Sequence, residues 1–187
     1  MSVQTWQETL ISSSVDGAAN TAGTAASAIP PAALLTLPPN WWYVGRMMKL
    51  TAHGRISCAV TTPGTAKWQV RLGPTANISV FDSGALNLNV VAKTTVPFWL
   101  EIIMTCRAVG NATTANLFGF GQFSSEAVVG SPLPTVGGNG SLICPVGTPA
   151  VGTGFDSTTA SILDLWFTQT VGTGSMTVHL YKVESLN

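Results

Sequence analysis

Charge is scarce in this chain of 187 residues, because only 9% of them are Asp, Glu, Lys or Arg. Eight basic residues balance eight acidic ones, so there is no net charge that would attract nucleic acid or anionic lipid. We therefore expect no nucleic-acid partner. A surface with so few charges is weakly solvated, which favours a protein that other subunits partly cover.

Long apolar runs are also missing. No segment reaches the roughly 18 consecutive apolar residues that a membrane-spanning helix needs, so we expect no membrane partner. Residues 1–8 lack the basic start and the apolar run of a secretory signal. This predicts synthesis in the cytoplasm.

Residues suited to catalysis or metal binding are few. The chain has two histidines and three cysteines. Cys58 and Cys106 fall on the apolar side of predicted strands, which indicates buried, reduced thiols rather than a disulfide or a metal site. His53 and His179 fall on the polar side and are expected to be surface histidines. A site joining both to Asp164 or Glu101 can be drawn, but no spacing favours it.

Known catalytic motifs are absent as well. There is no nucleophile elbow around any serine and no phosphate-binding loop followed by Lys-Ser or Lys-Thr. No motif selects a pair of carboxylates for glycoside hydrolysis, and Asp156 reads as a turn residue that caps its own backbone. We therefore expect no enzyme, no cofactor and no metal, with a hydrolase as the most distant alternative.

What the chain does have is alternation with a period of two, which is typical of strands that have one buried face. In residues 48–60 the even positions are Met48, Leu50, Ala52, Ile56, Cys58 and Val60, and the odd positions between them are polar. Residues 66–72, 98–108, 162–167 and 176–181 alternate in the same way. Residues 116–124, rich in glycine and phenylalanine, are a further strand, twisted or bulged.

The order of these strands predicts the fold class. A Gly/Pro/Ser/Thr-rich connection, residues 129–159, separates the last two strands from the rest, as in a Greek-key crossover. We predict an all-β protein, an antiparallel β-sandwich of jelly-roll or Greek-key type. Residues 1–28, rich in Ala, Thr, Gly and Ser, are expected to form an extended N-terminal arm, and residues 29–187 a single sandwich domain.

Aromatic and large apolar residues also occur at positions expected to face outward or to lie in loops. Such residues concentrate in the buried centres of protein interfaces, although strands buried on both faces would give the same pattern. The candidate interface residues are Trp6, Trp41, Trp42, Tyr43, Trp99, Ile103 and Trp166. Clustered aromatics also suit stacking on sugar rings, so a lectin remains an alternative.

Five stretches carry a family resemblance: 10–19 (LISSSVDGAA), 35–40 (LTLPPN), 128–134 (VVGSPLP), 148–157 (TPAVGTGFDS) and 184–187 (ESLN). Together they resemble small structural proteins encoded among the virion genes of tailed bacteriophages and prophages. These stretches are arm and loop sequences, so the resemblance transfers no functional residue.

The resemblance implies a non-enzymatic virion protein, with a head decoration (cement) protein as the main expectation. Its partners would be the major capsid protein and further copies of itself, a homotrimer being favoured. It would lie on the capsid surface after synthesis in the host cytoplasm. The alternative is a minor tail protein or tail-fibre head that binds a host receptor or glycan.

Overall fold

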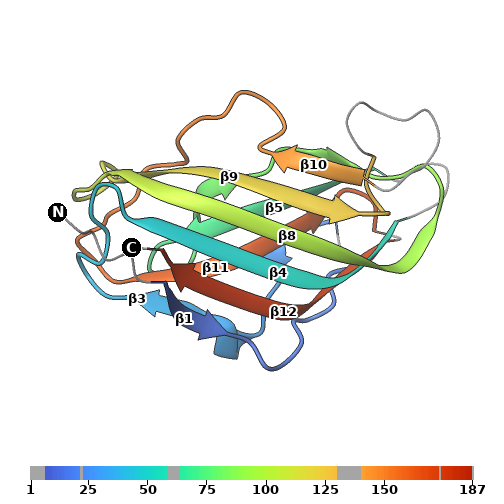
Figure 1. Ribbon diagram of the computed structural model, residues 1–187, viewed down its shortest axis with the longest axis horizontal. Helices are drawn as coiled ribbons and strands as arrows, with labels where there is room; N and C mark the ends of the chain where they lie inside the picture. The colour runs from blue at the N-terminus through green and yellow to red at the C-terminus, as the bar shows by residue number, and fades with distance from the viewer. Residues whose placement is uncertain (1–6, 22, 59–63, 130–139, 173, 187) are drawn as a thin grey trace.

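The computed structural model describes residues 7–21, 23–58, 64–129, 140–172 and 174–186. In this part of the chain two antiparallel sheets pack against each other, which confirms the predicted all-β sandwich. Figure 1 shows one sheet in front of the other; we call the front one sheet A and the rear one sheet B. Among the described residues the single helical element is a 3-10 turn, η1 (Pro31–Ala33).

Each sheet is built from strands that lie far apart in the sequence. Sheet A has six strands in the order β1 (Glu8–Ser12), β12 (Ser175–Ser185), β4 (Met47–Cys58), β8 (Lys93–Ala108), β9 (Asn116–Ser125) and β10 (Gly140–Cys144). Sheet B has the order β2 (Ala26–Ser27), β11 (Ser161–Gln169), β5 (Thr65–Leu72) and β6 (Ile78–Asp82). Two short strands complete it: β3 (Leu35–Leu37) beside β11 and β7 (Leu86–Asn87) beside β5.

Two of the crossings between the sheets occur at matching places. The chain passes from β4 in sheet A to β5 in sheet B, and it returns from β11 in sheet B to β12 in sheet A. Because β4 neighbours β12 and β5 neighbours β11, the early and late strands are paired in both sheets. This non-sequential order agrees with the predicted Greek-key or jelly-roll winding. The sequence pattern predicts no strand within residues 129–159, where β10 lies.

Strand β4 illustrates how the sequence pattern produces the layers. Its even-numbered side chains, Met48, Leu50, Ala52, Ile56 and Cys58, are buried as predicted, while Val60 lies outside the described residues. The remaining inward position is Gly54. A Cβ atom there would lie 2.0 Å from the carbonyl oxygen of Thr177, so a side chain at residue 54 would push β12 away from β4.

An aromatic cluster joins the two sheets at the centre of the core. The Trp68 ring on β5 lies 4.7 Å from Phe167, 5.4 Å from Phe98 and 5.7 Å from Phe123, measured between ring centroids. Phe98 and Phe123 belong to sheet A, whereas Trp68 and Phe167 belong to sheet B. Burial of such side chains stabilises the fold by roughly 1.5–3 kcal/mol each. The dry interior between the sheets is therefore the main source of stability.

The N-terminal segment is extended, as predicted, but its described part is paired with the sandwich. Strand β1 pairs with β12 at the edge of sheet A, where Figure 1 shows the blue strand beside the dark red one. Further on, the N–H of Gly17 donates to the Val178 carbonyl at 2.8 Å, and that of Ala28 to the Leu165 carbonyl at 2.7 Å. The described part of residues 7–28 therefore belongs to the same folded unit as the described part of the sandwich.

Candidate functional site

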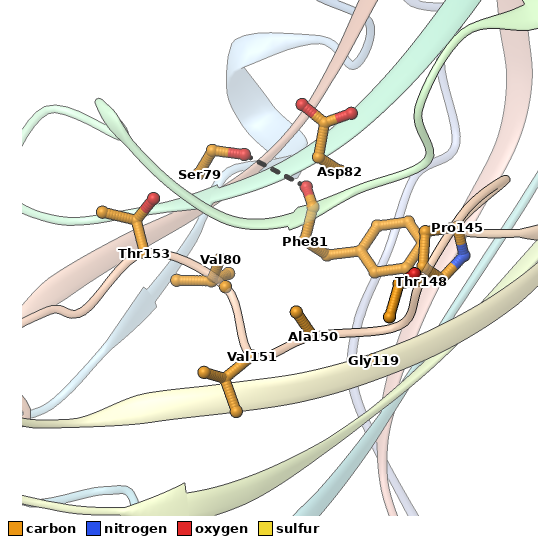
Figure 2. A pocket seen from close by; sticks show the side chains of 11 residues that line it. Ser79, Val80, Phe81, Asp82, Gly119, Pro145, Thr148, Ala150, Val151 and Thr153 are labelled. Atoms are coloured by element: carbon orange, nitrogen blue, oxygen red, sulfur yellow. Dashed lines mark hydrogen bonds between the residues drawn. The ribbon is translucent and has the colours of Figure 1, made fainter.

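A pocket of about 300 Å³ lies between β6 and the loop of residues 145–153 (Figure 2). Asp82 is the one titratable residue in its lining. In Figure 2 the Asp82 carboxylate points away from Ala150 and Val151. It already binds Lys67 Nζ at 3.1 Å and Gln69 Nε2 at 2.7 Å. General acid–base catalysis needs a positioned proton donor or acceptor free to meet the substrate, and this pocket does not offer a pair of them.

The histidines do not converge with acidic residues to form a metal site. His179 Nδ1 lies 2.9 Å from the Asp16 carboxylate on the surface, and His53 lies on the outer face of β4. Glu101 belongs to β8 in sheet A, whereas Asp164 belongs to β11 in the other sheet. Within the described ranges no three His, Cys, Asp or Glu side chains are grouped closely enough to hold a metal ion.

The three cysteines are all buried and unpaired, which confirms the predicted burial of Cys58 and Cys106. Burial raises the pKa of Cys58 and Cys106, and raises that of Cys144 to about 12. The thiolate is the nucleophilic form of cysteine. These thiols stay protonated near neutral pH, so their environment gives none of them the character of an activated nucleophile.

Asp156 has the turn geometry that the sequence predicts. Its Oδ1 accepts hydrogen bonds from the Thr158 N–H at 2.8 Å and from the Thr158 hydroxyl at 2.6 Å. These bonds from Thr158 lower the pKa of Asp156. The carboxylate thus holds a loop rather than facing a pocket.

Among the described residues there is also no helix of the length and apolar character required to cross a bilayer.

The residues predicted to form an interface do not gather on one surface. Trp99 and Ile103 lie on the outer face of sheet A, on β8. Trp166 lies on the outer face of sheet B, where the Arg71 guanidinium stacks 3.8 Å from the centre of its ring. Trp6 lies outside the described residues. Among the described residues, these candidates are therefore divided between opposite faces of the molecule.

The remaining members of that set belong to the loop before β4. Trp42 is only 5% exposed and packs 6.1 Å from Phe155, so it is a core residue rather than part of an outer surface. Trp41 is half-buried, with its ring 4.7 Å from that of Trp42. Arg46 Cζ lies 3.8 Å from the Trp41 ring and 5.0 Å from the exposed Tyr43 ring. The sequence pattern could not separate inward from outward residues here because a loop has no strand periodicity.

A different apolar surface emerges on sheet A, which we call the β9–β10 patch. It consists of outward-facing apolar side chains of three neighbouring strands and the following loop: Ile103, Phe118, Phe120, Ile143, Val146 and Val151. Ile143 is 71% exposed and Phe120 43% exposed. Two shallow hollows, of about 600 and about 170 Å³, both have Phe120 and Ile143 in their lining. Contiguous exposed apolar area of this kind marks contact surfaces.

Of this patch, Ile103 alone is among the interface residues that the sequence pattern predicts. In β9 the inward positions include Gly119 and Gly121, which weakens the contrast between the two faces. A Cβ on Gly119 would lie 2.7 Å from the Phe81 ring, and one on Gly121 would lie 2.6 Å from the Glu101 carbonyl oxygen. Glycine therefore occupies the buried face while Phe118 and Phe120 point outward. The strict alternation of glycine and phenylalanine in residues 118–121 is the signal that would have revealed them.

Comparison of the chain with protein-family models, with curated proteins and with solved structures finds no match.

Proposed function

We propose that this protein is a non-enzymatic structural subunit of a bacteriophage virion, a decoration protein that stabilises the capsid. The observation that carries the proposal is the β9–β10 patch. Exposed phenylalanine and isoleucine side chains reduce solubility in an isolated protein, whereas they stabilise a subunit that is covered in an assembly. The pocket in Figure 2, with one carboxylate already bonded, supports a non-enzymatic role.

The occupant we assign to the patch is another copy of this chain. With eight basic and eight acidic residues, identical copies do not repel one another. The patch also reaches β10, the last strand of sheet A, and no strand of the described residues pairs with its far side. An edge strand beside apolar side chains is a surface on which a second chain can dock. The family resemblance favours a trimer.

Stabilisation of the capsid would follow from mass action. A protein that binds the assembled lattice, and not its dissociated or altered forms, shifts the equilibrium toward the intact shell. An oligomer that contacts several major capsid subunits at once gains further through avidity. The proposed site of action is thus the capsid surface, reached after synthesis in the host cytoplasm.

Copy number on purified virions tests this proposal. In a stained gel of virions that carry the gene, a decoration protein appears in many copies and remains with the heads when tails are removed. Detection at only a few copies per particle, all on the tail fraction, would contradict the proposal. That second result would favour a minor tail protein or fibre head.

One observation favours that second candidate. Trp99 is 36% exposed at the centre of sheet A and lies opposite His53 on the neighbouring strand. An exposed tryptophan among polar side chains suits recognition of a host glycan as well as contact with another subunit.

A further inference from the structure

The outer face of sheet A carries two adjoining hollows that share one residue, His53. The first, of about 360 Å³, includes Trp99, Ser124 and Glu126 in its lining. The second, of about 310 Å³, includes Thr51, Ser12 and Lys182. We call the two together the His53 groove. Both volumes lie within the range of roughly 300–1,000 Å³ that is usual for small-molecule sites.

Strand register fixes the direction of the groove. Leu180 of β12 lies opposite His53 of β4, His53 opposite Trp99 of β8, and Trp99 opposite Ser124 of β9. These residues form one row across four adjacent strands. A ligand in the groove would therefore run perpendicular to the strands and contact one side chain from each of them.

The position of the groove restricts how it can recognise a ligand. Strands β12, β4, β8 and β9 are each paired on both sides, so their backbone N–H and C=O groups are used within sheet A. A peptide that binds by strand addition needs the free edge of a sheet. Recognition in this groove must come from side chains alone.

Those side chains offer one aromatic surface and many hydrogen-bonding groups. The Trp99 ring is partly exposed, and hydroxyl groups of Thr51, Ser12 and Ser124 line the two hollows. The His53 imidazole between the hollows has one donor and one acceptor nitrogen when it is neutral. A ligand that matches this lining has an apolar face to stack on the indole and several hydroxyl groups around it.

The two charged residues in the lining of the groove are already paired. Glu126 Oε2 lies 3.3 Å from Lys93 Nζ, and Lys182 Nζ lies 2.8 Å from Glu184 Oε1. Beside the lining, Arg55 lies opposite Pro97 and Glu101 opposite Thr51, which adds one charge of each sign. No single sign of charge therefore dominates the groove and selects an anionic or a cationic ligand. This neutrality agrees with the balanced charge of the whole chain.

We propose that the His53 groove binds a neutral oligosaccharide, with Trp99 stacking on one sugar ring and His53 contacting the neighbouring unit. A sugar ring combines an apolar C–H face with equatorial hydroxyls, and this is the combination that the groove complements. The assignment goes beyond the proposed structural role, which requires no ligand.

The test is an NMR titration of the full-length ¹⁵N-labelled protein. The probes are maltohexaose, cellohexaose, laminarihexaose and a mannan-derived hexasaccharide, with a heparin hexasaccharide as the anionic comparison. We expect saturable shifts of the Trp99 indole N–H with at least one neutral probe. Trp99→Ala should weaken this binding at least tenfold, whereas Trp99→Phe should retain part of it. Trp166→Ala, on the opposite sheet, is the matched control and should leave the affinity unchanged.

Three results would overturn the assignment. They are no shift with any neutral probe, equal affinity of the wild type and Trp99→Ala, or binding of the heparin hexasaccharide alone. Thermal melting of each variant establishes that it is folded before its affinity is compared. None of these results changes the copy number on virions, so this proposal and the proposed function fail independently.

Discussion

At the scale of single residues, the Glu184 carboxylate on the outer face of sheet A contacts three polar side chains. Its side chain is 5% exposed and accepts hydrogen bonds from Gln7 at 2.7 Å and from Lys182 at 2.8 Å, with Lys49 Nζ at 3.4 Å. Burial opposes ionisation of Glu184, but the bonds from Lys182, Gln7 and Lys49 outweigh it and lower the pKa. One carboxylate thus connects β12 to β4 and to the residue before β1.

This arrangement predicts a specific loss of stability in acid. Because the folded-state pKa lies below the unfolded value of about 4.3, the contribution of Glu184 is complete above that pH and is lost as the pH falls through the folded pKa. Glu184→Gln should cost about 1 kcal/mol at neutral pH, since the partner lysines keep some solvent contact. Its urea midpoint should also fall less than that of the wild type between about pH 7 and about pH 3.

The matched control for this measurement is Glu8→Gln. Glu8 is exposed on β1, near the same edge of sheet A. Its substitution should leave both the midpoint and the acid dependence as in the wild type. If the wild type and Glu184→Gln lose stability equally as the pH falls, then Glu184 is not the source of the predicted loss of stability in acid.

At the scale of elements, the position of the N-terminal segment depends on backbone hydrogen bonds to neighbouring strands rather than on its side-chain pattern. Gly17 lies against the β2 region, where a Cβ atom would be 2.1 Å from the carbonyl oxygen of Ala28. At Gly23, six positions further on, a Cβ atom would make only ordinary van der Waals contact, since its nearest atom would be 3.6 Å away. The segment is therefore closely packed at one glycine and loosely packed at the other.

These two glycines give a direct test of whether residues 7–28 are part of the sandwich. Gly17→Ala should lower the free energy of unfolding by about 1–3 kcal/mol, because the methyl group must displace backbone. Gly23→Ala should be neutral or slightly stabilising, by up to about 1 kcal/mol, through the lower entropy of the unfolded chain. Thermal and urea unfolding measure both. If the two variants are equally stable, the segment is a separate arm rather than a paired element.

The sequence predicted strands well where many residues alternate between apolar and polar. It predicted them poorly where only backbone pairing with a neighbouring strand determines that a strand forms. Strands β4 and β8 have 12 and 16 residues, long enough for the alternation to be unambiguous. Strand β10 has five residues within a segment rich in glycine and proline, and β2 has two. Such edge strands depend on backbone hydrogen bonds to a neighbour that a single sequence does not identify.

The same limit applies to the candidate site. Trp99 and Ile103 were predicted to face outward because the residues of β8 alternate clearly between its two faces, and they do so. Trp42 was misplaced because it lies in a loop, and Ile143 was missed because β10 itself was missed. The patch depends on three strands brought together by register, which no local pattern contains.

At the scale of the whole molecule, the low charge and the β9–β10 patch both favour association between copies of the chain. The chain has no net charge and few charged residues, so repulsion between copies is weak. The β9–β10 patch adds exposed apolar area at one end of sheet A. An isolated copy therefore combines attraction at one surface with little repulsion elsewhere. This combination favours a defined oligomer over a monomer.

We therefore expect the purified protein to sediment as an oligomer near neutral pH, and Ile143→Lys to shift it toward monomer. A lysine at the centre of the patch would have to lose its hydration on assembly, at a cost of about 3 kcal/mol or more. Since each 1.4 kcal/mol is about a tenfold change, association should weaken by at least about 100-fold. The control is Leu180→Lys, because Leu180 is 60% exposed on the same face but lies on β12. Sedimentation velocity over a range of concentrations measures all three proteins. A monomeric wild type, or equal loss of association in the two variants, would show that the β9–β10 patch does not hold copies of this chain together.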